Sequence, residues 1–156
     1  YEQGKFQLDD PIEKYLPEFA EMRVLTGGSA AQPVTRHATA SITPRHIMTH
    51  TAGLTYGFEG VPHAVDEIYR YRKIGNDKQT LAEFTEALGK APLRFDPGTS
   101  WNYSYGTDVQ GRLIEALSGM RGDVSSLAVG AAQIVPGRDL DAGNQQSVID
   151  QALSAD

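Results

Sequence analysis

The feature that most constrains this chain is the point at which its aromatic residues stop. Every Phe, Tyr and Trp of the 156 residues lies at or before Tyr105. From Arg121 onward there is no Lys or His, and two Arg against five Asp give this segment −3 of the net charge of −6. Aromatic and large aliphatic side chains supply most of the area that a core buries. We therefore expect one domain over residues 1–120 and a weakly packed tail, in which only 144–155 has a helical apolar pattern.

Composition excludes several functional classes. The net charge of −6 and the lack of a long Lys or Arg run leave no basic surface for nucleic acid or an anionic membrane. The absence of Cys excludes disulfides, thiolate metal sites and a cysteine nucleophile. No apolar stretch approaches the roughly 18 residues of a membrane span. The glycine-containing loop at 26–32 lacks the Lys of a phosphate-binding loop, so we expect no cofactor. Localisation is left open.

Four short helices are predicted from capping residues and apolar spacing. The predicted ranges are 11–16, 44–52, 81–88 and 109–118. The start signals of the first three are Asp10 with Pro11, Thr43 with Pro44, and the capping-box pair Thr80 and Glu83. The residues expected to end the four helices are Pro17, Gly53, Gly89 and Gly119.

Two connecting segments also have local signals. The Gly, Ser and Pro content of residues 26–36 indicates an exposed loop. The sequence Asp96-Pro97-Gly98 has Pro and Gly at the central positions that a type II turn favours. This turn leads directly into a run of aromatic and hydroxyl residues that contains Tyr103.

Four stretches carry a resemblance to a known family. They occur in the order and at about the spacing seen in the serine β-lactamase-like hydrolases, which include class C β-lactamases, family VIII carboxylesterases and D-alanyl-D-alanine carboxypeptidase relatives. The stretches are "EQGKFQLDDPIEKYLPEF", "ITPRHIMTHTAGL", "PLRFDPGTSWNYSYG" and "LIEALSGM". Several matches in the right order are more specific than any single motif. The resemblance covers 1–120, and 121–156 does not match, as expected of a shifted reading frame or a fusion.

The resemblance implies a fold class as well as a chemistry. The segment between the family's two catalytic motifs is the helical subdomain of the α/β serine β-lactamase and penicillin-binding-protein fold. We therefore expect a mostly α structure with little sheet. The implied activity is acyl-enzyme hydrolysis of a small-molecule ester or amide, with carboxylesterase favoured.

Tyr103 is the candidate catalytic residue. It matches the tyrosine of the family's Y-x-N-like motif, which works with a serine and a lysine of an S-x-x-K motif. A serine hydroxyl is a weak nucleophile until a base removes its proton, and a phenol can do so only where positive charge favours phenolate. The lysine of the S-x-x-K motif would favour the phenolate, and the start of the following helix would do so more weakly. The alternative is that Tyr103 is an ordinary half-buried tyrosine.

Tyr105, Tyr56 and His50 are the candidate substrate-binding residues. Tyr105 stands where many relatives have the Asn of Y-x-N, which favours an esterase over β-lactam hydrolysis. Tyr56, with Phe58, could form an apolar wall for an acyl or alcohol group. The resemblance places the stretch around His50 at the edge of the substrate cleft. The alternative for each tyrosine is core packing.

The two histidines of "RHIMTH" have one feature of a metal site. His46 and His50 have the i, i+4 spacing of a zinc site, but the Glu of an H-E-x-x-H motif is missing. We expect no metal, and a role for one His at a helix end instead.

The sequence also lacks part of the expected chemistry. None of its nine serines has a lysine three residues later, so no S-x-x-K motif is present, and neither is the downstream K-T-G-like or H-x-G-like strand motif. The first residues read as the last turn of a helix closed by Gly4. We therefore expect a fragment that is inactive alone. The alternatives are a non-catalytic helical binding or truncated module, and a fragment of a β-lactamase or D-alanyl-D-alanine carboxypeptidase.

Overall fold

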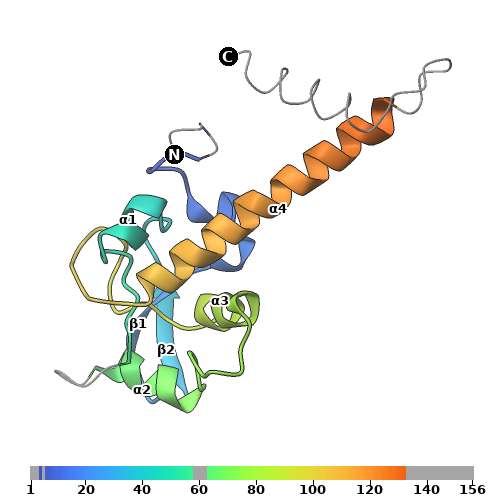
Figure 1. Ribbon diagram of the computed structural model, residues 1–156. Helices are drawn as coiled ribbons and strands as arrows, with labels where there is room; N and C mark the ends of the chain where they lie inside the picture. Colours follow the sequence, from blue (N-terminus) through green and yellow to red (C-terminus); the bar gives the residue numbers. More distant parts are fainter. Residues whose placement is uncertain (1–3, 5, 58–62, 133–156) are drawn as a thin grey trace. The chain divides into compact units, whose positions relative to one another are not determined.

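The computed structural model describes residues 4, 6–57 and 63–132, with the side chains of 120–132 left aside. The chain divides into two units, 1–116 and 117–156, and each is treated by itself. The elements, shown in Figure 1, are the 3-10 helices η1 (Ile12–Lys14) and η2 (Pro17–Phe19), the strands β1 (Arg23–Gly28) and β2 (Pro33–His37), and the helices α1 (Pro44–Met48), α2 (Ala64–Tyr71), α3 (Leu81–Gly89) and α4 (Gly106–Ala132).

Sheet is a minor part of the structure, as expected. The two strands have 6 and 5 residues, against 5, 8, 9 and 27 in the four α-helices. Helices thus provide most of the regular structure, and the long connections between them are loop. No helix in the described part of the chain has the length and apolar character needed to cross a membrane.

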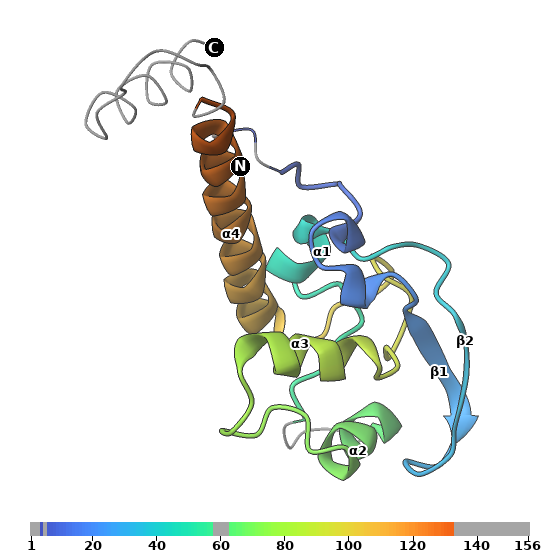
Figure 2. The ribbon, with the colours of Figure 1, turned by 90° about the vertical axis from the view of Figure 1, so that its right-hand side faces the viewer.

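The predicted loop at 26–36 is wrong, because most of it forms an antiparallel hairpin (Figure 2). The turn is closed by mutual backbone bonds of 3.2 and 3.1 Å between Ser29 and Gln32. On its other side β1 pairs with Leu93, whose carbonyl accepts from Leu25 over 3.0 Å and whose N–H donates to Arg23 over 2.7 Å. This pairing partner is far away in sequence, so local composition could not indicate a strand.

The first predicted helix is also wrong in kind. Two 3-10 turns, η1 and η2, replace an α-helix over 11–16, and Pro17 begins the second turn. The N-cap of η1 is Pro11 and not the predicted Asp10. Its carboxylate instead accepts from Gln7 N–H and Lys14 Nζ, both at 3.2 Å, and from the Tyr15 hydroxyl. Asp10 is therefore engaged by three other groups.

The capping signals of α1 and α3 are confirmed. The Thr43 hydroxyl accepts from His46 N–H, and Thr80 with Glu83 forms the expected capping box. The helix α3 ends at Gly89 as predicted, whereas α1 stops at Met48, short of the predicted end. The chain leaves α1 through left-handed backbone at His50, with φ of 56°.

The helix α2 was not predicted, and α4 is longer than predicted. The N-cap of α2 is His63, whose ring nitrogen accepts from Val65 N–H, and His is an unusual capping residue. The prediction that Gly119 ends the last helix is wrong, since α4 continues through it without a positive φ. Glycine in a helix costs about 1 kcal/mol relative to alanine, which weakens a helix without ending it.

The core of the first unit is built by short elements. Its largest fully buried side chains lie on η1, η2, the four α-helices and the loops that connect them: Tyr69, Phe19, Ile12, Leu16, Ile42, Ile47, Leu54, Ile68, Leu88, Leu93, Val65 and Val109. Ile42 and Ile47 stand at the two positions of a hydrophobic staple around the Thr43 cap, and both are buried. On α4, Val109 and Leu113 face this core, while Ile114 is 65% exposed. The tail prediction for 144–155 lies outside the described residues.

Candidate active site

Tyr103 lies in the loop between α3 and α4, three positions before α4 begins at Gly106. The predicted type II turn is present in this loop: Thr99 N–H donates to Asp96 over 3.1 Å, and Gly98 has φ of 83°. Gly98 N–H donates to the carbonyl of Thr51 over 2.8 Å. The turn therefore fastens the loop to the segment that follows α1.

The structure brings all four candidate residues together. The Tyr103 ring lies 4.7 Å from the His50 ring and 5.7 Å from the Tyr56 ring, between centroids, and Tyr56 stacks on Tyr105 at 4.3 Å. The rings of Trp101 and His50 form a T-shaped pair with their centroids 6.3 Å apart. These five residues, which we call the aromatic cluster, come from two segments about 50 positions apart in the sequence. Phe58, the other predicted wall residue, lies outside the described residues.

Exposure separates the two tyrosines of the loop. Tyr103 is 53% exposed, so its ring is not a core residue. Tyr105 is half-buried and packs against Tyr69 and Phe84 at centroid distances of 6.4 and 4.9 Å. Its hydroxyl also fills the space beside Gly75, where a Cβ would stand 2.2 Å from that oxygen. Burial raises the pKa of Tyr105, with nearby Tyr56 and Asp108 adding to the shift. Packing thus accounts for much of the Tyr105 ring, whereas Tyr103 is presented to solvent.

His50 joins the two segments. Its Nδ1 lies 3.2 Å from the Oγ of Ser104, which is 2% exposed, and its carbonyl accepts from Asn102 N–H over 2.9 Å. A positive φ is uncommon at residues other than Gly, although His adopts it more often than most, and at His50 it is accompanied by these two contacts. Gly106 permits this packing, since a Cβ there would be 2.5 Å from the carbonyl oxygen of Ile47.

The two histidines of the metal hypothesis are engaged separately. His46 Nδ1 accepts from the backbone N–H of Thr43 over 3.3 Å, while His50 Nδ1 faces Ser104. Burial is the main cause that lowers the pKa of His46. Across the described ranges, no group of three or more His, Cys, Asp or Glu is placed to hold a metal ion.

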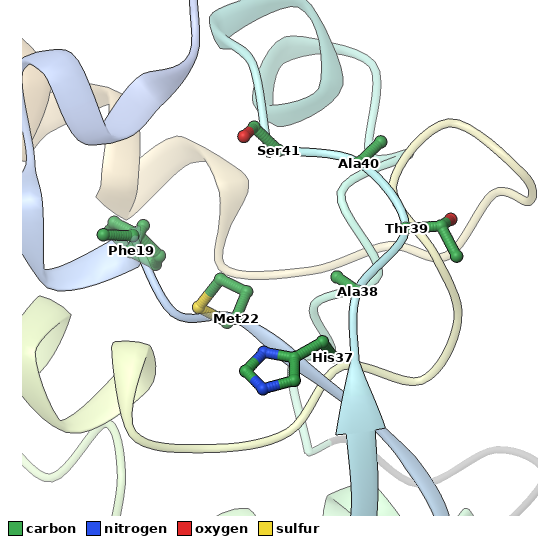
Figure 3. A pocket seen from close by; sticks show the side chains of 8 residues that line it. Phe19, Met22, His37, Ala38, Thr39, Ala40 and Ser41 are labelled. Carbon is green, nitrogen blue, oxygen red and sulfur yellow. The ribbon is translucent and has the colours of Figure 1, made fainter.

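Two hollows of the structure are lined by residues outside the aromatic cluster. One, of about 220 Å³, is bordered by the chain around Phe19 and Met22 and by residues His37 to Ser41 (Figure 3). The other, of about 330 Å³, lies between the hairpin and the end of α3, with Arg23, Arg72 and Lys90 on its walls. No residue of the aromatic cluster lines either of these two hollows.

Sequence reasoning missed several residues of this site. Trp101 and Ser104 neighbour Tyr103 in sequence, and the single Trp was a signal that could have been used. Asn102 accepts a hydrogen bond from Arg94, whose guanidinium lies 4.0 Å from the carboxylate of Asp66. Their partners lie in other elements, so no motif in the sequence links them.

Comparison with known proteins decides the family. The Beta-lactamase family model matches residues 1–124. The chain belongs to the Beta-lactamase family. Its relatives include the acyltransferase calJ of Penicillium decumbens, 32% identical over 123 residues that cover 76% of this chain and 27% of that protein. They also include the esterase EstB of Burkholderia gladioli, 35% identical, with 74% of this chain and 27% of that protein covered.

Two solved structures are similar to this chain. The unliganded simvastatin synthase LovD from Aspergillus terreus is 32% identical, with a TM-score of 0.56 over 76% of this chain and 29% of that one. EstCE1, a hydrolase with promiscuous acyltransferase activity, is 30% identical, with a TM-score of 0.58 over 76% of this chain and 28% of that one. The chain therefore spans under a third of the length of these relatives. Over the matched part, the chain shares the fold of these structures, and its relatives include esterases and acyltransferases.

Proposed function

We propose that this chain is the Tyr103-bearing segment of a serine hydrolase or acyltransferase that acts on small-molecule esters through an acyl-enzyme. The observation that carries the proposal is the placement of Tyr103, half exposed, beside His50 and Tyr56 at the start of α4. We further propose that residues 1–120 are the helical-subdomain part of the family fold and that 121–156 is an unrelated tail. The family match supports the first statement.

The proposed chemistry uses the phenol of Tyr103 as a general base. Phenolate oxygen accepts the proton of a serine hydroxyl, the serine oxygen bonds to the ester carbonyl carbon, and the alcohol departs with a proton returned by the tyrosine. Water then attacks the acyl-enzyme in hydrolysis, or a second alcohol does so in acyl transfer. Both outcomes share one intermediate, which agrees with the mixture of esterases and acyltransferases among the relatives.

The rest of the acyl-transfer centre has to come from outside this sequence. No serine of the chain has lysine at the S-x-x-K spacing. Loss of one member of such a constellation already removes several orders of magnitude of rate. We therefore propose that the chain alone has no esterase activity.

The aromatic cluster is proposed to contact the substrate beside Tyr103. Tyr56 and His50 flank the Tyr103 ring, and Tyr105 supports Tyr56 from the core side. An aromatic at position 105 cannot offer the amide of an asparagine, so it offers less to a β-lactam or peptide amide. The proposal therefore favours esters over amides.

The test is a chimaera in which residues 1–116 replace the matched segment of EstB. It is assayed with p-nitrophenyl butyrate beside the 156-residue chain. Tyr103→Phe keeps the ring and deletes its oxygen, so kcat should fall by about 100-fold, the scale of losing a positioned base. Tyr71→Phe is the matched control, because Tyr71 is an exposed tyrosine on α2 and should keep full activity.

Two outcomes would contradict the proposal. Full turnover in the Tyr103→Phe chimaera would show that Tyr103 is not the base. Enzymatic turnover by the isolated chain would show that the acyl-transfer centre is complete within it.

A further inference from the structure

The loop that carries Tyr103 is joined by backbone hydrogen bonds to the segment that follows α1. Asn102 N–H donates to the carbonyl of His50 over 2.9 Å, and Tyr105 N–H donates to the carbonyl of Thr55 over 3.3 Å. Tyr103 lies between these two bonds. Its backbone position therefore depends on how firmly the two segments are joined.

Asn102 makes three side-chain bonds at this junction, in addition to the contact between His50 and Ser104. Its Nδ2 donates to the carbonyl of Leu54 over 3.0 Å and to that of Tyr103 over 2.9 Å, and its Oδ1 accepts from Arg94 over 2.8 Å. A guanidinium can only donate and a carbonyl can only accept, so these three partners permit one orientation of the amide. Asn102 thus ties the carbonyl of Tyr103 itself to the neighbouring segment.

Arg94 is in turn held by a buried carboxylate. Its guanidinium lies 4.0 Å from Oδ2 of Asp66, a residue of α2 that is only 2% exposed. The other carboxylate oxygen accepts from the hydroxyl of Thr55. Oδ2 also accepts from the backbone N–H of His63 over 3.2 Å, so hydrogen bonds fix the carboxylate, which offers Arg94 a buried opposite charge. The network runs from α2 through Arg94 to Asn102.

We propose that Asn102 is the positioning residue of Tyr103, with Arg94 and Asp66 fixing the orientation of its amide. The proposal rests on the proposed role of Tyr103 as the base. Asn102 does not touch the reacting atoms; it sets where the phenol stands relative to them. A misplacement of about 1 Å can cost about 100-fold in rate, so a residue that only positions is enough to matter.

Two variants separate the parts of this arrangement. Asn102→Asp keeps the side-chain shape and an acceptor for Arg94, but it loses both N–H donors. Asn102→Ala loses all three bonds. The matched control is Asn76→Asp, because the Asn76 amide donates to the Lys73 carbonyl over 2.9 Å within its own loop. Both variants lose the amide N–H donors of Asn102, so both should displace Tyr103.

The first experiment uses the 156-residue chain and needs no activity. The chain is labelled with 3-fluorotyrosine, and Tyr103→Phe and Tyr69→Phe assign two fluorine NMR signals. In Asn102→Asp and Asn102→Ala the Tyr103 signal should shift or broaden beyond its original width, while the signal of buried Tyr69 stays in place. Asn76→Asp should move neither signal.

The outcome against the proposal is a Tyr103 signal that keeps its position and width in Asn102→Asp while the chain stays folded. If both Asn102 variants lose the Tyr69 signal, Arg94→Gln decides by the same two signals, because it leaves the amide in place and removes its guanidinium partner. An unmoved Tyr103 signal in that variant also overturns the proposal.

The second experiment uses the EstB chimaera and a double-mutant cycle. Asn102→Asp should lower kcat about 10-fold with KM within about twofold, since positioning acts on the reacting geometry. In the Tyr103→Phe background the same change should cost nothing further, because Asn102 acts through Tyr103. Equal losses in both backgrounds would overturn the positioning role. Full activity of Tyr103→Phe would overturn the proposed function instead, and the NMR result would still stand by itself.

Discussion

Replacing Gly53 with alanine should loosen the junction on which the candidate site depends. Gly53 has φ of 83°, and a Cβ built there would stand 2.3 Å from the carbonyl oxygen of Phe95 and 3.1 Å from the Cβ of Leu93. Leu93 is fully buried and cannot move aside. The carbonyl of Gly53 also accepts the N–H of Arg94 over 2.7 Å. The two segments meet here with no room for a methyl group.

The size of the effect follows from two separate costs. Left-handed backbone costs an alanine roughly 1–2 kcal/mol, and the reduced freedom of the unfolded chain returns about 0.4–1 kcal/mol. Gly57 has φ of 73° and no neighbour within 4 Å among the residues described, so Gly57→Ala should cost about 1 kcal/mol from the backbone alone. The overpacking at Gly53 adds roughly 1–3 kcal/mol. Gly53→Ala should therefore cost about 2–4 kcal/mol.

Thermal unfolding followed by circular dichroism measures this difference. With roughly 4 °C per kcal/mol for a domain of this size, Gly53→Ala should melt about 8–16 °C lower than the parent and Gly57→Ala about 4 °C lower. The Gly57 variant is the matched control for positive φ without a close neighbour. Equal losses of stability in the two variants would show that the contact with Phe95 does not constrain the loop, and the reasoning would then be wrong.

Two further measurements concern acid stability and the tail. Burial is the largest cause that lowers the pKa values of His46 and His63 below 6.5 in the folded chain. The free energy of unfolding should therefore be fully present above pH 6.5 and be lost as the pH falls through the lowered pKa values. His63→Asn keeps a side-chain acceptor for Val65 N–H but has no imidazole to titrate. Its urea midpoint should therefore depend less on pH between about pH 5 and 8 than that of the parent. An unchanged pH dependence would contradict this. Truncation after Met120 should leave the melting temperature nearly unchanged, and a drop of several degrees, or about 1 kcal/mol, would show that the tail stabilises the chain.

Signals within a few residues predicted the local structure correctly. The Thr43 and Thr80 caps, the end of α3 at Gly89 and the type II turn at Asp96 to Thr99 all depend on atoms three or four positions apart. A side-chain oxygen that caps a helix, or a glycine that supplies positive φ, acts on its own neighbours. The sequence also carried the family resemblance, which the family match confirms.

Elements that depend on distant partners could not be predicted in this way. The hairpin needs the backbone of Leu93, and α2 begins at a histidine whose capping role shows only in the fold. Ending α4 at Gly119 was wrong because a glycine lowers helix stability without stopping the helix.

The sequence by itself determined the caps of α1 and α3, the turn before Tyr103 and the residue types of the proposed acyl-transfer site. The tertiary structure decided which of those residues meet. Tyr103 reaches His50 and Tyr56 only because the loop and the segment after α1 exchange backbone hydrogen bonds, and because Asn102 joins them. Contacts across about 50 positions depend on the packing of the whole first unit, because closing so long a loop is offset only by many contacts made together.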